Sequence, residues 1–304
     1  MMCETRKEIG GNCADEWRNG VQIHKYGPHL FHTNDEGVWQ FLSRFTDWTP
    51  YEHRVVADTS LGRISIPYNQ RTEQQIGKSL ESREIRELIF RQYSEKQWGC
   101  VWESLPTSIT SRVPLRREDA DDRYFTDKYQ GQPANGYANL FKEMLSGIEV
   151  EFTATNQAWR SLALAMDMVV YTGKLDEYFN HSLGRLPYRS LQFRHHWGVP
   201  LGHAQINQCN DSPITRQYAH HYFSNAKQGK FCMTEELPCA HTEHNEPFYP
   251  MPFGGGLTLS SAYKAKARKE SKTMFLGRLA TYTYMDMWMA VAQVRTKLAT
   301  FTNI

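Results

Sequence analysis

Stretches in which apolar and polar residues alternate are interspersed with stretches of helical periodicity along the whole 304-residue chain. Alternation favours a half-buried strand, whereas apolar residues recurring three and four positions apart favour an amphipathic helix. The two patterns are mixed from one end of the sequence to the other, without an internal repeat or a low-complexity tract. The sequence therefore predicts an α/β or α+β fold, and its length suits one large domain or two interleaved ones.

Turn and capping residues place several of these elements. Asn19-Gly20 separates two short strand-like segments and predicts a hairpin, and Leu61-Gly62 indicates a second one. A helix is expected over residues 36–45, with Asn34 or Asp35 as its N-cap.

The remaining segments follow from periodicity and composition. Residues 71–98 are charged and helical in pattern, with Ile76, Leu80, Ile85, Leu88, Ile89 and Tyr93 near helical spacing. Residues 103–135 are polar and contain proline, which predicts a loop segment. Further helices are expected at 137–145, after the glycines 254–256 and at 285–298, and strands at 148–153, 168–172, within 185–235 and at 273–276.

Composition excludes several classes of protein. The formal net charge is only +2, from 35 basic and 33 acidic residues, so a nucleic-acid partner has no support. The longest apolar run, residues 162–171, is interrupted by Asp167 and is too short to span a membrane. Six scattered cysteines form no regular framework, and no secretory signal opens the chain. We therefore expect a cytoplasmic protein with free thiols.

Seven short strings carry a resemblance to a known family. In chain order they are IGGN at 9–12, YGPHLFHT at 26–33, YSEKQWG at 93–99, RVPLR at 112–116, DDRYFTDKYQGQP at 121–133, SPITR at 212–216 and GRLATYTYMDM at 277–287. In this order and rough spacing they resemble the UDP-galactopyranose mutases, flavoenzymes that interconvert the pyranose and furanose forms of UDP-galactose. The resemblance covers nearly the whole chain.

The sequence departs from that family in two places. It contains no GxGxxG strand–turn–helix unit, which in the family holds the pyrophosphate of FAD. The stretch between Asn69 and Tyr93 is also several dozen residues shorter than the resemblance implies, in a region that belongs to a helical domain. Glu4 is the candidate for the acidic residue that binds the FAD ribose.

The resemblance implies a fold and its domain boundaries. We expect an α/β protein with an incomplete FAD-binding Rossmann-like domain, an inserted helical domain and an antiparallel sheet domain. The expected parts are a remnant of the FAD-binding domain at 1–68, a shortened helical and mobile-loop region at 69–145, sheet and FAD-domain strands at 146–235, and a return to the FAD-binding domain at 236–304.

The resemblance also implies a reaction. Reduced FAD is the expected cofactor, and UDP-galactose is the expected substrate of this isomerase. The family's reaction proceeds through a bond between flavin N5 and the anomeric carbon, with no net redox change. It supplies galactofuranose for cell-surface glycans. A homodimer is possible, although its contacts lie in the shortened helical region.

Site residues follow from the matching motifs. The expected catalytic residues are Arg116, Arg216 and His32. The expected substrate-binding residues are Asn69, Tyr93, Trp98, Tyr124, Asn207, Tyr249 and Tyr284. The expected cofactor-binding residues are Gly10, Gly11, Asn12, His29, His32, Arg278, Tyr284, Asp286 and Met287. The paired arginines suit this role because two guanidinium groups can stabilise charge that develops on a departing diphosphate.

Other interpretations of the same residues stay open. An arginine can be an ordinary surface residue, buried Tyr and Trp can simply pack in a core, and Asp286 can serve only as a helix cap. His29 and His32 have the spacing of a metal pair, but no cysteine or carboxylate accompanies them in ligand register, so no metal is expected. Two alternatives to a working mutase remain: a catalytically dead relative that binds UDP-sugar, and a different FAD-dependent oxidoreductase.

Overall fold

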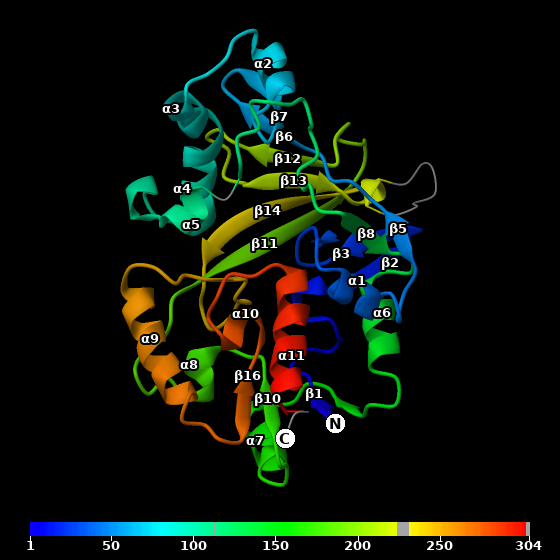
Figure 1. Ribbon diagram of the computed structural model, residues 1–304, viewed down its shortest axis with the longest axis vertical. Coiled ribbons are helices and arrows are strands. Elements are labelled where there is room, and N and C mark those ends of the chain that lie inside the picture. Colours follow the sequence, from blue (N-terminus) through cyan, green and yellow to red (C-terminus); the bar gives the residue numbers. More distant parts are fainter. Residues whose placement is uncertain (112, 224–230, 302–304) are drawn as a thin grey trace.

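The computed structural model describes residues 1–111, 113–223 and 231–301. The molecule is elongated, with small helices and a hairpin at one end, a long sheet across the middle and a mixed lobe at the other end (Figure 1). Strands and helices alternate throughout the described chain, as the mixed sequence pattern predicts. Arg112, the first residue of the RVPLR motif, and residues 224–230 of the strand-rich region lie outside the described residues.

A seven-stranded sheet forms the middle of the molecule (Figure 1). Its strand order is β15 (Tyr249–Pro250), β11 (Tyr188–Trp197), β14 (Cys232–Ala240), β13 (Arg216–Ala219), β12 (Gln205–Gln208), β6 (Val55–Thr59) and β7 (Gly62–Ile66). Neighbouring strands are antiparallel except β12 and β6, which are parallel. The sheet is therefore mixed, and the hairpin β6–β7 from the first part of the chain extends it.

Both predicted hairpins are confirmed. Strands β2 (Asp15–Arg18) and β3 (Val21–His24) are antiparallel, and Asn19 and Gly20 between them have φ of 51° and 78°. Positive φ at both central residues matches the twist of the flanking strands, which explains the Asn-Gly pair. In the second hairpin Thr59 pairs with Gly62, so the turn falls at residues 60 and 61.

The loop predicted for residues 103–135 is wrong in part. The segment contains the short helix α5 (Thr107–Thr110) and the strand β8 (Tyr129–Pro133), preceded by a 3₁₀ turn, η3 (Trp102–Ser104). β8 is the central strand of a three-stranded sheet, between β4 (Phe31–Thr33) and β5 (Trp48–Pro50). The sequence of β8 is polar and lacks apolar alternation, so it does not predict a strand. Hydrogen bonds to a neighbouring strand on each edge stabilise it instead. Gly131 is required there, since a Cβ atom would lie 3.0 Å from the Thr49 carbonyl oxygen.

The helical region at 71–98 is real but interrupted. It consists of α2 (Gln70–Ile76), α3 (Ser82–Ile85), the π-helical turn η2 (Arg86–Arg91) and α4 (Gln92–Trp98). Asn69 caps α2 through a capping box with Thr72, and Gly77 ends the helix with φ of 80°. The periodicity predicted one helical segment, and the glycine breaks it.

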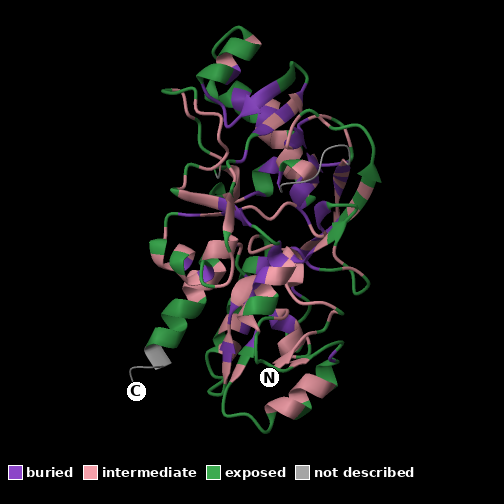
Figure 2. Ribbon diagram, turned by 90° about the vertical axis from the view of Figure 1, so that its right-hand side faces the viewer, coloured by how far each residue is buried: buried purple, intermediate pink, exposed green. Residues whose placement is uncertain are grey.

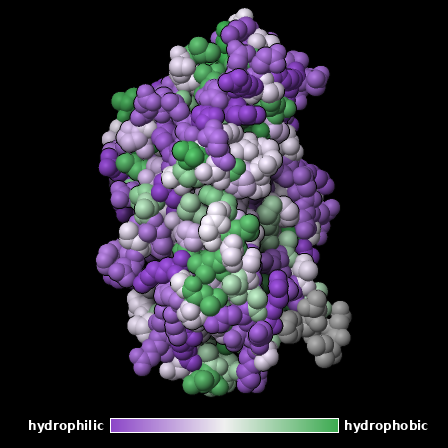
Figure 3. Space-filling view, turned by 90° about the vertical axis from the view of Figure 1, so that its left-hand side faces the viewer, coloured by the Kyte–Doolittle hydropathy of each residue, from purple (hydrophilic) through white to green (hydrophobic). Residues whose placement is uncertain are grey.

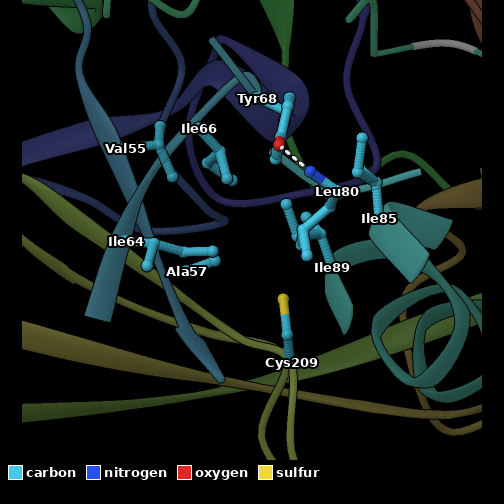
Figure 4. Packing of buried hydrophobic residues seen from close by; sticks show 9 residues of the cluster. All are labelled: Val55, Ala57, Ile64, Ile66, Tyr68, Leu80, Ile85, Ile89 and Cys209. Carbon is cyan, nitrogen blue, oxygen red and sulfur yellow. Dashed lines mark hydrogen bonds between the residues drawn. The ribbon is translucent and has the colours of Figure 1, made fainter. Parts of the chain in front are cut away.

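These helices pack on the β6–β7 hairpin. Nine buried residues form the core there: Val55, Ala57, Ile64, Ile66, Tyr68, Leu80, Ile85, Ile89 and Cys209 (Figure 4). The Tyr68 hydroxyl accepts a hydrogen bond of 2.7 Å from the Leu80 amide across this core. Leu80, Ile85 and Ile89 are thus buried as their spacing predicts.

Two other helices begin as expected. The Asp35 side chain accepts a hydrogen bond of 2.9 Å from the Val38 amide and caps α1 (Glu36–Leu42). Helix α6 (Tyr137–Met144) receives its cap from a distant residue, because the buried Asp15 carboxylate accepts from the Tyr137 and Ala138 amides at 2.6 and 2.8 Å. The sequence alone does not show this second cap.

The lobe at the other end combines short parallel strands with helices. Two parallel strand pairs occur: β1 (Met2–Cys3) with β9 (Val150–Glu151), and β10 (Val169–Tyr171) with β16 (Thr273–Phe275). The accompanying helices and turns are η1 (Gly11–Cys13), α7 (Asn156–Ala163), α8 (Leu175–Tyr178), α9 (Gly255–Ala267), α10 (Gly277–Ala280) and α11 (Met287–Phe301). The turn η4 (His220–Tyr222) instead follows β13 and packs on β3 and β14. The predicted strands at 148–153, 168–172 and 273–276 and the terminal helix are confirmed, with the strands shorter than expected.

Burial is concentrated around the central sheet, whereas several helices of the lobe are largely exposed (Figure 2). On the face shown in Figure 3, hydrophobic side chains gather near the middle between more hydrophilic regions. Within the described residues, no helix combines the length and apolar character needed to cross a membrane.

Candidate active site

A cavity of about 610 Å³ lies where the sheet, the helix α4 and the lobe meet. It gathers most of the predicted site residues from distant parts of the chain: Asn12, His29, His32, Tyr93, Trp98, Tyr124, Asn207, Arg216, Tyr249, Arg278, Tyr284, Asp286 and Met287. The structure thus brings the predicted substrate and cofactor residues into one space.

Arg216 and Glu236 form a buried ion pair in this cavity. Nε and Nη2 of Arg216 each lie 2.9 Å from Oε1 of Glu236, whose side chain is 1% exposed. The other carboxylate oxygen, Oε2, is buried without a hydrogen-bond partner among the described residues. Burial lowers the pKa of the Arg216 guanidinium, but Glu236 together with Tyr93 and Tyr249 outweighs it and holds that pKa well above its usual range. Arg216 therefore stays cationic.

Aromatic rings surround that cation. The Tyr249 hydroxyl accepts a hydrogen bond of 3.2 Å from Nη2 of Arg216, and the Tyr249 ring stacks on Tyr284 at a 10° interplanar angle. Trp98 lies 5.8 Å from Tyr249, centroid to centroid. The Arg278 guanidinium lies over the Tyr284 ring at 5.1 Å. Stacked rings beside two guanidinium groups suit a flat, anionic ligand.

Two phenol groups of the cavity, those of Tyr93 and Tyr249, have a raised pKa and stay protonated at neutral pH. Burial raises the pKa of Tyr249 to about 12, with Arg216 acting in the opposite direction. Burial likewise raises the pKa of Tyr93, despite Arg216 nearby. Protonated phenols can donate hydrogen bonds to phosphate oxygens.

The two predicted histidines have different surroundings. His29 Nδ1 lies 2.9 Å from the Gly27 carbonyl oxygen, so Nδ1 donates and Nε2 is left as the acceptor. Burial lowers the pKa of His29 to about 4, so its ring is neutral at pH 7. His32 stacks on Phe125 at 3.6 Å, and its Nδ1 lies 2.9 Å from Oδ2 of Asp127.

The glycine turn at 9–12, where phosphate binding is predicted, leads into the 3₁₀ turn Gly11–Cys13. Gly10 and Gly11 have φ of 105° and 55°, and the space beside the Gly11 α-carbon is open. Arg6 donates a hydrogen bond of 2.8 Å to the Asn12 side chain, and its Nη1 is buried without a partner among the described residues. The guanidinium also pairs with Glu246 through Nη2 at 2.9 Å, so only Nη1 is left to bind a further acceptor beside the open turn.

Four predicted residues lie outside the cavity lining: Gly10 and Gly11 of the glycine turn, and Asn69 and Arg116. Asn69 is fully buried as the N-cap of α2, and its Nδ2 donates to the Asp121 carbonyl oxygen at 2.8 Å. The Arg116 guanidinium donates to the carbonyl oxygens of Asp121, Arg123 and Tyr124. Contact between Arg116 and a ligand in the cavity would require these bonds to open.

Sequence inspection missed three residues that the structure places in or beside the site: Arg6, His53 and Glu236. Glu236 follows Glu235 in β14, and the sequence does not show which of the two faces inward. A signal existed for Arg6, because it falls between the acidic Glu4 and the glycine turn. Only the tertiary structure reveals the other two.

A second cluster lies on the sheet away from the cavity lining. The ligand atoms of His195, His220 and Cys232 are within 4.8 Å of one another. Nδ1 of His220, however, accepts from the His24 amide at 3.1 Å, so the ring proton sits on Nε2, which points to Thr234 Oγ1 at 2.7 Å. A ligating histidine normally donates from its other nitrogen. The cluster therefore gives no support to a metal, and the expected absence of a metal stays a prediction.

Comparison with known proteins places this geometry in a family. Residues 88–284 match the family model of UDP-galactopyranose mutase, and residues 1–45 match an NAD(P)-binding Rossmann-like domain. A dTDP-fucopyranose mutase of Escherichia coli is 30% identical, over 95% of this chain and 88% of that protein. A Klebsiella pneumoniae protein named "Probable UDP-galactopyranose mutase" is 31% identical, over 95% of this chain and 85% of that protein.

Solved structures agree in fold. A reduced UDP-galactopyranose mutase superposes with a TM-score of 0.72 at 13% identity, covering 93% of this chain and 85% of that chain. A fatty acid isomerase from P. acnes gives a TM-score of 0.55 at 10% identity, covering 99% and 92% respectively, which shows a shared fold alone. The family model spans most of the chain, including the α4 helix and the Arg216 strand. The chain belongs to the UDP-galactopyranose mutase family.

Proposed function

We propose that this chain interconverts UDP-galactopyranose and UDP-galactofuranose without net redox change. The observation that carries the proposal is Arg216, a cation held by Glu236 within a cavity lined by Trp98 and Tyr249. A nucleoside diphosphate sugar offers the matching groups: a flat base, two phosphates and a sugar with hydroxyls.

The residues present fit FAD as the cofactor. The open turn at Gly11 and the unsatisfied Nη1 of Arg6 suit its phosphate and ribose portion, and His29, Arg278 and Asp286 line the cavity where the ring system would lie. When bound and reduced, FAD supplies a nucleophilic ring nitrogen for the anomeric carbon, with no net transfer of electrons.

The protein's own groups then act on charge and position. Arg216 stabilises the negative charge that the departing diphosphate gains, and the protonated Tyr249 can donate a hydrogen bond to it. Trp98, which is 7% exposed, excludes water from one wall of the cavity. Neutral His29 offers Nε2 as a hydrogen-bond acceptor beside the ring system.

Turnover of UDP-galactofuranose by the FAD-loaded, dithionite-reduced protein tests the proposal. Chromatographic separation of the two UDP-sugars should show conversion, and Arg216→Ala should abolish it. Arg116→Ala should do the same if its carbonyl contacts open during the reaction. A protein that binds FAD and UDP without conversion would support the inactive relative, and net oxidation of a substrate would support an oxidoreductase.

Because the E. coli relative is a dTDP-fucopyranose mutase, the same assay should also be run with a dTDP-linked 6-deoxy sugar as substrate. Light scattering of the purified chain tests whether it is a monomer or a homodimer.

A further inference from the structure

The ammonium group of Lys96 lies inside a ring of backbone carbonyl groups. Nζ donates to the carbonyl oxygens of residues 208, 210, 212 and 214 at 2.8, 2.9, 2.8 and 3.1 Å. No ion pair between described side chains includes Lys96. An ammonium has three N–H donors and no acceptor, so four oxygens saturate it.

This coordination resembles that of a monovalent cation. Carbonyl oxygens that surround a desolvated charge are the ligands by which proteins hold K⁺. Alternate residues of one short segment supply all four oxygens here, so the segment curves around the charge. Without a central cation, four carbonyl dipoles would point at one another.

The segment connects Lys96 to the active site. It joins β12 to β13 and ends two residues before Arg216, the first residue of β13. Thr215 continues the connection, because its amide donates to the Glu236 carbonyl oxygen at 2.9 Å. The position of the guanidinium therefore depends on how the segment is folded.

The helix that bears Lys96 carries the opposite wall of the cavity. Tyr93 and Trp98 both lie in α4 and both line the cavity. Arg189 fixes the other side of the same helix, by donating to the Lys96 and Gln97 carbonyl oxygens at 3.1 Å each. The ammonium group of Lys96 thus links the helix that carries Tyr93 and Trp98 to the segment that leads to Arg216.

We propose that Lys96 is a positioning residue, a tethered monovalent cation that folds residues 208–214 around itself and so fixes Arg216 against Tyr93 and Trp98. The predicted effect of Lys96 on turnover rests on the proposed function, whereas its predicted effects on UDP affinity and on stability do not. It also predicts that the carbonyl ring persists as a cation site when the side chain is shortened.

Chemical rescue tests the inference. Lys96→Ala removes three carbons and the nitrogen, which n-propylammonium replaces atom for atom. We expect kcat to fall on the order of 10²-fold, as a misplacement of about 1 Å can produce, and UDP affinity to weaken. Added n-propylammonium should restore both with saturable dependence, whereas tetramethylammonium, which has no N–H donor, should not. The matched control is Lys266→Ala, because Nζ of Lys266 donates to the Ser182 hydroxyl and lies over the Phe179 ring, away from any ring of carbonyl groups; this variant should respond to neither amine.

Several outcomes would overturn the inference. The inference is wrong if Lys96→Ala without added amine has the UDP affinity and turnover of the wild type. It is also wrong if the variant loses them and n-propylammonium fails to restore them. If Lys96→Ala is largely unfolded, its melting temperature should rise with n-propylammonium while that of the Lys266→Ala control does not, and absence of that difference refutes the carbonyl ring. A wild-type protein without mutase activity would count against the proposed function, while UDP affinity and the melting temperature would still decide the role of Lys96.

Discussion

Replacing Glu236 by glutamine separates the charge of the buried pair from its shape. The variant keeps a hydrogen-bond acceptor near Arg216 but leaves the guanidinium without a counter-charge. With Oε1 2.9 Å from two guanidinium nitrogens, the charge centres are about 4 Å apart, and their attraction at an effective dielectric constant near 20 is about 4 kcal/mol. Removing one partner of a buried pair costs about 3–5 kcal/mol. Because the Arg216 side chain is 19% exposed, we expect a loss of about 3 kcal/mol.

Urea denaturation of the ligand-free protein measures this loss as a lower midpoint at unchanged slope. UDP should stabilise the variant more than the wild type, because its diphosphate can take the place of the lost carboxylate. The matched control is Glu243→Gln, since Glu243 pairs with Arg185 at 3.6 Å with both side chains well over half exposed. Such a surface pair should contribute little that can be resolved.

A double variant completes the test. Arg216→Met with Glu236→Leu removes both charges and leaves neither one buried alone, so it should be more stable than Glu236→Gln. Two results would contradict this prediction: a Glu236→Gln variant as stable as the Glu243→Gln control, or a double variant less stable than Glu236→Gln.

Three further predictions concern stability. Ile85→Ala should cost about 2–5 kcal/mol by leaving a cavity in the core beside Leu80, whereas Leu61→Ala, at an exposed turn, should be neutral in the same urea assay. Asp15→Ala should cost at least about 1–2 kcal/mol, because the first turn of α6 loses its cap, and Asp15→Asn should recover part of that loss. Burial lowers the folded-state pKa of His24 and His53 to about 3, so below pH 6.5 the unfolded chain binds protons that the folded protein does not. Stability should be complete above pH 6.5 and fall as the pH drops, by up to about 1.4 kcal/mol per pH unit for each such histidine. His53→Gln should flatten this slope in denaturation series between pH 5 and 8, and an unchanged slope would contradict the assignment.

The sequence by itself determined what local geometry controls. Asn19-Gly20 and the Asp35 cap fixed a hairpin and a helix start, because their preferences depend only on neighbouring backbone. The motifs also identified the family, and most of the site residues that they predict line the cavity. The boundaries of the helical region were less certain from periodicity, since Gly77 interrupts it through a single backbone angle.

Only the tertiary structure decided the features that depend on pairing across the chain. The strand β8 exists because β4 and β5 pair with it on both edges, and its polar sequence gives no hint of that. Glu236 becomes the counter-charge of Arg216 because their strands are neighbours in register. Lys96 gains its four carbonyl partners from residues more than 110 positions away. The sequence specifies which side chains carry a charge, whereas the fold determines which partner each buried charge meets and therefore what it does.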